Sequence, residues 1–270
     1  MPYAEVNGRR LHYIRRGEGD PLLLIMGLSG NHLHWGEPFL EELEGAFDVI
    51  AHDNRGIGRS DHHAGPFTVA DMADDAVGLL DALGLESAHV MGISMGGMIA
   101  QEVALRHPEH VRSLVLGCTY AGGEGSALTA EAVISRLTQL FMSGDVEGAL
   151  RAGWEVNVSR AYREAHPEAG ERMLQIAAEL PGTMEILMAQ VQAVAGHNTS
   201  ARLGEIKAPT LIVHGTEDEM LGVANARQIA ELMPDARLEI LDGAGHLFFW
   251  EQPQRAAELV RENASVAARQ

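Results

Sequence analysis

Apolar residues in this chain gather in short runs that are followed by polar or glycine-rich loops. A run of this kind is typical of a strand buried on both faces, as in a parallel sheet. The predicted parallel strands lie at residues 22–26, 47–52, 88–93, 113–118, 208–214 and 237–241. Before them, Asn7-Gly8 predicts a hairpin over residues 4–14, because this pair favours a two-residue turn. We therefore expect a mostly parallel sheet that opens with an antiparallel hairpin.

Between these strands, apolar residues recur every three or four positions, which predicts amphipathic helices. The helices expected beside the sheet lie at residues 37–43, 69–83, 98–105, 223–232 and after 253. From about residue 121 to residue 203 no strand is predicted, and helices are expected at 129–142, 145–155, 159–180 and 183–195. A helical block between two strands of one sheet is typical of an inserted cap. We predict an α/β core domain made of residues 1–120 and 204–270, with a helical cap insertion at 121–203.

Composition narrows the class of protein and its partners. The 270 residues are 46% hydrophobic, which is sufficient for a buried core. Acidic residues outnumber basic ones 38 to 20, giving a net charge of −18 without any basic cluster, so nucleic acid and membrane are not expected partners. Cys118, the only cysteine, lies in an apolar run and is predicted to be a buried strand residue. With a polar amino terminus and no apolar run of about 18 residues, we expect a cytoplasmic protein, and a homodimer stays open.

One serine lies between a predicted strand and a predicted helix, in the stretch AHVMGISMGGMIAQ at residues 88–101. Gly92, Ser94 and Gly96 match the G-x-S-x-G nucleophile elbow, in which a sharp turn exposes the serine hydroxyl at the carboxyl edge of a sheet. The flanking residues must be small because strand and helix approach closely there. A purely structural glycine-rich turn is the alternative, but the strand–turn–helix context favours Ser94 as a nucleophile.

A serine hydroxyl needs a base to take its proton and a third group to orient that base. His246 follows the last predicted strand in a Gly-Ala-Gly-His turn, and Asp218 follows the strand before it. Together with Ser94, these residues follow the carboxyl ends of parallel strands, where open α/β sheets place their sites, and their order along the chain is the one expected. We predict a Ser-His-Asp triad, with Glu217 and Glu219 as alternative acids.

Other polar motifs favour structural roles. The loop at residues 53–60 contains two glycines of a dinucleotide site but lacks the third glycine and a following helix. Asp53 and Arg55 are therefore predicted to organise this loop through hydrogen bonds. His32 and His34, in the loop after the first parallel strand, are predicted at the surface, with a place in the lining of a pocket as the alternative. No metal site is predicted, because no H-E-x-x-H or Cys/His ligand set occurs.

The elbow, the stretch at residues 24–28, the loop at residues 53–60 and the Gly-Ala-Gly-His turn resemble the α/β-hydrolase superfamily over nearly the whole chain. Its capped branch of esterases, enol-lactonases and carbon-carbon hydrolases is most similar. The resemblance implies an α/β-hydrolase fold and an oxyanion hole formed by the backbone N–H groups of Leu28 and Met95. Met26 stands where the family usually has histidine. A serine nucleophile, where related dehalogenases and epoxide hydrolases use aspartate, indicates acyl transfer.

We predict a serine hydrolase that cleaves a carboxylic ester or a lactone through an acyl-enzyme, without a metal or a cofactor. Two alternatives stay open: a carbon-carbon hydrolase of a ring-fission product, and a small-molecule receptor that keeps the hydrolase pocket. Apolar residues of the loops and cap are expected to contact the substrate, namely Trp35, Trp154, Leu221 and Leu247. An acidic substrate would need a cap arginine, and the candidates are Arg136, Arg151, Arg160 and Arg163.

Overall fold

A single sheet of eight strands organises the computed structural model, which describes residues 2–62, 65–127 and 129–269. The strand order is β1-β2-β4-β3-β5-β6-β7-β8. The strands are β1 (Tyr3–Val6), β2 (Arg9–Arg16), β3 (Asp20–Ile25), β4 (Phe47–His52), β5 (Ala88–Ile93), β6 (Val111–Gly117), β7 (Thr210–Gly215) and β8 (Arg237–Leu241). β1 and β2 pair antiparallel, β2 pairs antiparallel with β4, and β3 to β8 are mutually parallel. The predicted parallel sheet with an opening hairpin is confirmed.

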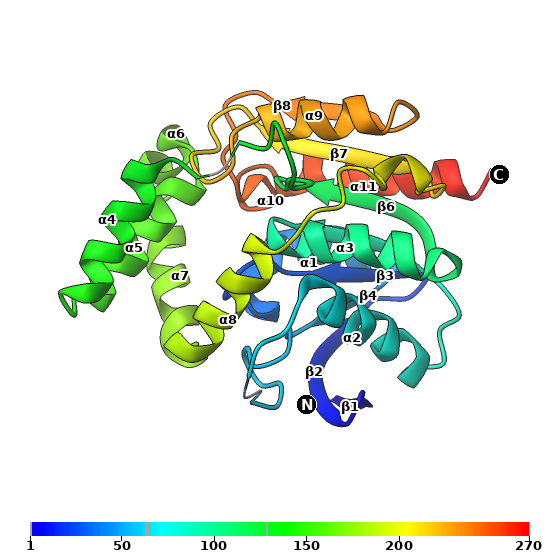
Figure 1. The fold of residues 1–270 in the computed structure, drawn as a ribbon, viewed down its shortest axis with the longest axis horizontal. Helices are drawn as coiled ribbons and strands as arrows, with labels where there is room; N and C mark the ends of the chain where they lie inside the picture. Colours follow the sequence, from blue (N-terminus) through cyan, green and yellow to red (C-terminus); the bar gives the residue numbers. More distant parts are fainter. Residues whose placement is uncertain (1, 63–64, 128, 270) are drawn as a thin grey trace.

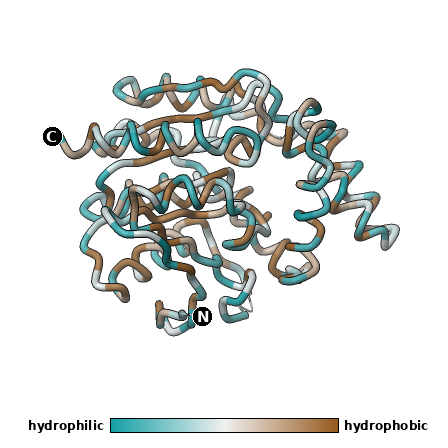
Figure 2. Tube along the Cα trace, turned by 180° about the vertical axis from the view of Figure 1, so that it is seen from behind, coloured by the Kyte–Doolittle hydropathy of each residue, from teal (hydrophilic) through white to brown (hydrophobic). Residues whose placement is uncertain are grey.

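Helices cover both faces of the sheet (Figure 1). One face carries α2 (Val69–Ala82), α3 (Met95–Arg106) and α9 (Ala224–Leu232), and the other carries α1 (Glu37–Glu44), α10 (Phe248–Glu251) and α11 (Pro253–Ala267). Short 3-10 helices are η1 (His32–Trp35), η2 (Pro108–His110) and η3 (Leu203–Glu205). Along β3, Leu23 and Ile25 join the core on one face while Leu22 and Leu24 join the core on the other, and all four are fully buried. Figure 2 shows hydrophobic residues concentrated along these central strands.

A helical block lies between β6 and β7, at one end of the sheet in Figure 1. It contains α4 (Glu131–Met142), α5 (Val146–Asn157), α6 (Arg160–Ala165), α7 (Pro167–Glu179) and α8 (Met184–Ala195). We call this block the cap. The described residues between β6 and β7 include no strand. The cap contacts the loops after several strands; for example, the Leu247 N–H donates to the Asn157 carbonyl, 2.8 Å away. The cap therefore lies against the carboxyl edge of the sheet.

Two local predictions are wrong. Residues 159–180 were predicted as one helix, but α6 ends at Ala165 and α7 begins at Pro167. Proline has no N–H to continue the first helix and disfavours helical geometry in the residue before it, so His166 adopts φ −129° and ψ 62°. Cys118 is buried as predicted, but it lies just after β6, which ends at Gly117, with φ 39°.

No helix in the described part of the chain is long and apolar enough to cross a bilayer.

Candidate active site

Ser94 occupies a strained turn between β5 and α3. Its backbone has φ 58° and ψ −123°, a combination that is readily available only to glycine. The Ser94 N–H donates to the Gly117 carbonyl at the end of β6, 2.9 Å away, and the Thr119 hydroxyl donates to the Ser94 carbonyl at 2.7 Å. Backbone strain of this kind persists only where the surroundings hold it in place, and it concentrates at functional sites. The predicted elbow is therefore present in the structure.

The glycines of the elbow are required by close contact between backbones. A Cβ atom on Gly92 would lie 2.0 Å from the Gly96 carbonyl oxygen, and one on Gly96 would lie 1.9 Å from the Ile25 carbonyl oxygen. No side chain fits at either position. Met95 begins α3, so its N–H has no acceptor inside the helix and remains available at the end where the helix dipole favours negative charge.

Asp218 and His246 form a buried hydrogen-bonded pair. His246 Nδ1 lies 2.7 Å from Asp218 Oδ2, and the side chains are 5% and 0% exposed. Asp218 Oδ1 accepts the N–H groups of Met220 and Leu221, each at 2.8 Å, which fixes the plane of the carboxylate. Burial by itself would raise the pKa of Asp218, but the charge of His246 and the hydrogen bonds from His214 and His246 outweigh burial and hold the pKa well below its usual range. An ionised Asp218 fixes His246 Nδ1 as the donor, which leaves Nε2 without a proton and able to accept one.

The alternative acids lie outside this arrangement. Glu217 and Glu219 are both exposed, whereas Asp218 between them is buried against the histidine. Local geometry explains the difference: β7 ends at Gly215, and a Cβ atom there would lie 2.1 Å from the Ala244 carbonyl oxygen. This close approach joins the loop after β7 to the loop after β8. Asp218 is therefore the carboxylate that meets His246.

A second histidine, His214, contacts the same carboxylate oxygen. His214 Nε2 lies 2.6 Å from the Leu221 carbonyl oxygen and 3.1 Å from Asp218 Oδ2, with both side chains fully buried. Because a carbonyl oxygen only accepts, Nε2 carries the proton. His214 Nδ1 has no partner among the described residues. No role for His214 could be predicted from the sequence, since nothing in a strand-terminal histidine indicates which loop it will face.

Glu251 ties the turn that carries His246 to the cap. Glu251 Oε1 accepts the N–H groups of Gly245, at 2.8 Å, and Ser159, at 2.9 Å, while the Ser159 hydroxyl donates to Oε2 at 2.5 Å.

Cys118 contacts the same turn, because its thiol donates to the Gly245 carbonyl oxygen at 4.0 Å. Burial, reinforced by the nearby charge of Asp218, raises the pKa of the Cys118 thiol well above its usual range. Cys118 therefore acts as a packing residue and not as a nucleophile.

The loop that carries Leu28 runs directly beside Ser94. A Cβ atom on Gly27 would lie 3.0 Å from Ser94 Cβ. Asn54 Nδ2 donates to the Met26 carbonyl at 3.0 Å, which holds the loop to the end of β4. Its other attachment comes from the cap, where Gln190 Oε1 accepts the Ser29 N–H at 2.8 Å. The two predicted oxyanion donors, Leu28 and Met95, thus lie on the two segments that flank Ser94.

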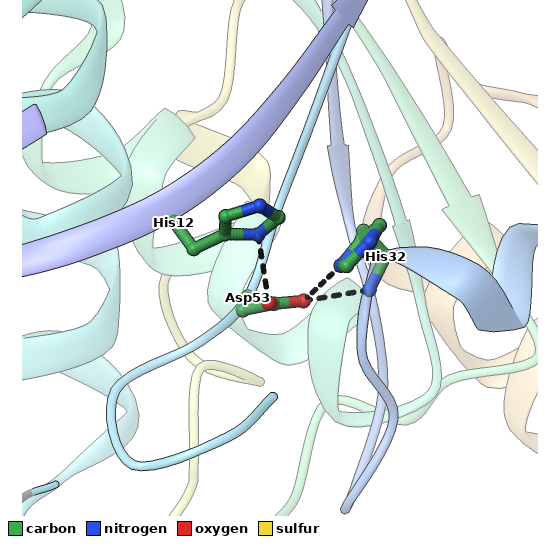
Figure 3. Close-up of side chains that lie close together, drawn as sticks. All are labelled: His12, His32 and Asp53. Atoms are coloured by element: carbon green, nitrogen blue, oxygen red, sulfur yellow. Dashed lines mark hydrogen bonds and ion pairs between the residues drawn. The ribbon is translucent and has the colours of Figure 1, made fainter. Parts of the chain in front are cut away.

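Asp53 anchors the far end of the same loop (Figure 3). Its Oδ1 accepts both the N–H and the Nδ1 of His32, each at 2.8 Å, and its Oδ2 contacts His12 Nδ1 and the Arg59 N–H, each at 2.9 Å. Burial would raise the pKa of Asp53, but hydrogen bonds from His12 and His32 outweigh it and lower the pKa. These three side chains lie within metal-binding distance, but Asp53 is fully engaged by N–H donors. The cluster is therefore structural.

The predicted organising role of Asp53 is confirmed, since it accepts the Arg59 N–H within the loop. The hydrogen bonds of the Arg55 side chain lead out of the loop, contrary to the prediction: its guanidinium donates to the Asp75 carboxylate and to the Asp71 carbonyl, each at 2.7 Å, and holds the loop to α2. The surface placement of His32 is wrong, because its side chain is only 3% exposed. His34 is half-buried, and burial lowers its pKa to about 4. The sequence could not place His32, since its acceptor lies 21 residues away on another strand end.

The four residues predicted to contact the substrate differ in their surroundings. The Trp35 indole is fully buried between Phe39 and Phe249, with ring centroids 5.9 and 4.9 Å away, so its predicted substrate contact is wrong and Trp35 is a core residue. Trp154 on α5 packs edge-on against Trp250 at 5.6 Å. Leu221 and Leu247 neighbour the Asp218–His246 pair. The substrate roles of Trp154, Leu221 and Leu247 stay predictions.

Two open clefts in the described residues lie away from this constellation. One, of about 500 Å³, is lined by residues of β2, η1 and α1, including Tyr13 and Leu33. The other, of about 480 Å³, lies in the cap between α4 and α5, beside Leu140 and Ala152. Neither is lined by Ser94 or by His246. We assign the site from the arrangement of its side chains and not from the size of a cleft.

The family follows from comparison with known proteins. A family profile described as "alpha/beta hydrolase fold" matches residues 20–253. The chain is an α/β hydrolase. The match spans the elbow and both partners of the buried pair, and it confirms the resemblance inferred from the sequence and the predicted fold class.

This α/β hydrolase is similar in sequence or structure to three proteins with named activities. It is 33% identical to a protein provisionally named carbamate hydrolase RutD from Azorhizobium caulinodans, over 92% of each chain. The enol-lactonase structure from Burkholderia xenovorans LB400 superposes with a TM-score of 0.86 at 26% identity, covering 98% of this chain and 100% of that one. Est816, described as an enzyme that degrades N-acyl homoserine lactones, superposes with a TM-score of 0.79 at 31% identity, covering 97% and 99%. These relatives support hydrolase activity for this chain.

Proposed function

We propose that this α/β hydrolase cleaves carboxylic esters or lactones through an acyl-enzyme, with Ser94 as nucleophile, His246 as base and Asp218 as the orienting acid. The observation that carries the proposal is the strained backbone of Ser94 at the end of β5, together with the 2.7 Å Asp218–His246 pair in the loops after β7 and β8. Since β5 to β8 are parallel, their carboxyl ends lie at the same edge of the sheet.

In the first half of the proposed reaction, Ser94 Oγ attacks the substrate carbonyl carbon while His246 Nε2 takes the hydroxyl proton. Negative charge develops on the carbonyl oxygen, and the N–H groups of Leu28 and Met95 donate to it. When the tetrahedral intermediate collapses, the bond to the leaving alkoxide breaks and His246 returns its proton to that oxygen. The serine then carries the acyl group as an ester.

In the second half, His246 takes a proton from a water molecule, whose oxygen attacks the acyl carbon. Collapse of this intermediate releases the carboxylic acid and returns the proton to Ser94. In these steps the protein contributes side chains and backbone N–H groups, and the solvent contributes the water molecule. The cap lies against the edge of the sheet to which we assign these steps, and we propose that Trp154, Leu221 and Leu247 contact the substrate there.

A carbamate is the second candidate substrate class, because the relative at 33% identity bears the name of a carbamate hydrolase. The same attack on a carbonyl carbon applies. A carbamate ester carries an alkoxy and an amino group on this carbon, and an alcohol is a better leaving group than an amine. The carbon–oxygen bond therefore breaks first, and His246 returns its proton to the alkoxide. Water then releases a carbamic acid from the carbamoyl group left on Ser94. Activity on carbamates alone would favour this class over esters.

The decisive test compares wild type, Ser94→Ala and Ser143→Ala on p-nitrophenyl butyrate, a γ-lactone, a carbamate and a ring-fission product. Ser143 is exposed in the cap and serves as a matched serine control. We expect Ser94→Ala to lose on the order of 10⁴-fold or more in kcat, and Ser143→Ala to match wild type. A fluorophosphonate probe should label Ser94, as mapped by mass spectrometry. Equal turnover by Ser94→Ala and wild type, or labelling at another residue, would overturn the proposal.

A further inference from the structure

Gln190 is a buried polar residue on the side of α8 that faces the core. Its relative exposure is 0%, and Ile186 and Ala193, one turn away on either side, are also buried. Gln190 Oε1 accepts the Ser29 N–H at 2.8 Å, across 161 residues of chain. Ser29 follows Leu28 in the loop whose Gly27 abuts Ser94. A glutamine of the cap is therefore bonded to the loop that lies against the proposed nucleophile.

The hydrogen bond from Ser29 fixes the orientation of the Gln190 carboxamide. A backbone N–H only donates, so the atom that faces Ser29 must be the carboxamide oxygen. The two N–H groups on Nε2 consequently face away from Ser29. Nε2 is fully buried and has no acceptor within residues 2–62, 65–127 and 129–269. Buried donors are nearly always paired, because an unpaired donor has lost its hydrogen bonds to water without replacement.

We propose that Gln190 Nε2 binds the substrate, by donating to an uncharged acceptor oxygen close to the scissile carbonyl. This inference rests on the proposed function and narrows its substrate class to esters and lactones that carry a second oxygen acceptor, such as an oxo or ether group. A carboxamide N–H is a neutral donor and suits a neutral acceptor. Gln190 could not be singled out from the sequence, because its position on an amphipathic helix gives no indication of its partner.

The engagement of the cap arginines favours a neutral acceptor over a carboxylate. An acidic substrate would need a cation near the site, and four cap arginines were candidates for that cation. Each of them already donates to an acceptor within the cap: Arg136 to Glu155 at 2.6 Å, Arg151 to Glu171 at 2.9 Å, Arg160 to Glu164 at 2.7 Å and Arg163 to the Glu155 carbonyl at 2.5 Å. Gln190, by contrast, is a buried side chain of the cap whose N–H groups have no acceptor among the described residues, and it is bonded to the loop that runs beside the proposed nucleophile.

Two pairs of esters test the proposal, each pair differing chiefly in one acceptor oxygen. Ethyl 4-oxopentanoate and ethyl pentanoate place it on the acyl side, and 2-methoxyethyl pentanoate and butyl pentanoate place it on the alcohol side. For each enzyme the preference is the ratio of kcat/KM within a pair. Gln190→Glu keeps an acceptor for the Ser29 N–H but replaces the donor with an oxygen, whereas Gln190→Leu removes both groups.

We expect wild type to prefer the ester with the added oxygen in at least one pair, and both variants to lose that preference by about 10-fold. The ratio isolates the donor, because a disturbed Ser29 contact would slow both members of a pair equally. Unchanged ratios in both pairs for both variants would overturn the proposal and would indicate that Nε2 meets only a buried water. Circular dichroism of each variant serves as the control for folding.

Calorimetry on the Ser94→Ala background separates this proposal from the proposed function. If wild type hydrolyses no ester, the proposed function fails, and binding still tests Gln190. Ser94→Ala should bind ethyl 4-oxopentanoate or 2-methoxyethyl pentanoate about 10-fold more tightly than the partner ester, and Ser94→Ala/Gln190→Glu should lose this difference. Equal binding of both members of each pair by both proteins would overturn the role of Gln190.

Discussion

The strained backbone of Ser94 predicts that a glycine at this position stabilises the protein while removing the proposed nucleophile. Ser94 adopts φ 58° and ψ −123°. A residue with a Cβ atom in such a region costs about 1–3 kcal/mol, and glycine removes that cost. Glycine also gives the unfolded chain more freedom, which costs about 0.4–1 kcal/mol. Ser94→Ala keeps the Cβ atom and therefore keeps the strain.

The free energy of unfolding of Ser94→Gly should exceed that of Ser94→Ala by about 1 kcal/mol, and by at most about 2.5 kcal/mol. For a chain of this size, 1 kcal/mol corresponds to a rise in Tm of about 2–4 °C. The measurement is paired urea and thermal unfolding of both variants, followed by far-UV circular dichroism. Neither variant should turn over an ester.

A matched pair at Ser135 provides the control, because this serine is exposed inside the helix α4. There Ser135→Gly should be less stable than Ser135→Ala, by about 1 kcal/mol, since glycine is a poor helix former. The two sites should thus respond with opposite signs. If Ser94→Gly is no more stable than Ser94→Ala, the elbow does not hold strain and the reasoning fails.

Three further predictions concern the supports of the site. Asp53→Asn should destabilise the protein at neutral pH. Because the pKa of Asp53 is lower in the folded state than in the unfolded state, wild type loses stability as pH falls below about 4, and the difference in free energy of unfolding between wild type and Asp53→Asn should shrink. Urea unfolding at several pH values measures this difference. A deficit that is constant down to pH 3 would contradict this. His214→Phe removes an N–H from Asp218 Oδ2, the oxygen that contacts His246, and leaves more negative charge on that oxygen. The acidic limb of the pH profile of kcat/KM should therefore move upward by up to about one pH unit. An unmoved limb would show that His214 does not act on His246 through Asp218. Gly96→Ala should lower stability by at least about 2 kcal/mol, because its Cβ would meet the Ile25 carbonyl oxygen at 1.9 Å, whereas Gly153→Ala, which meets nothing within 4 Å, should be neutral or stabilising in thermal melts.

Much of the fold could be predicted from the sequence because its signals are local. Alternating strand and helix periodicities predicted the parallel sheet, and Asn7-Gly8 predicted the hairpin that β1 and β2 form. The break between α6 and α7 also has a local cause, Pro167, but the helical periodicity around it concealed the break. The order of Ser94, Asp218 and His246 after strand ends was likewise visible along the chain.

What the sequence by itself determined is where strands end and which chemical groups follow them, because backbone geometry and periodicity depend on neighbours a few residues away. Tertiary structure decided which group meets which. Gln190 meets Ser29 across 161 residues, and Glu251 meets Ser159 across 92. Such contacts depend on how the cap packs against the carboxyl edge of the sheet, and no local pattern encodes that packing. The candidate nucleophile could therefore be located from the sequence, whereas the cap residue proposed to select the substrate became visible only in the folded protein.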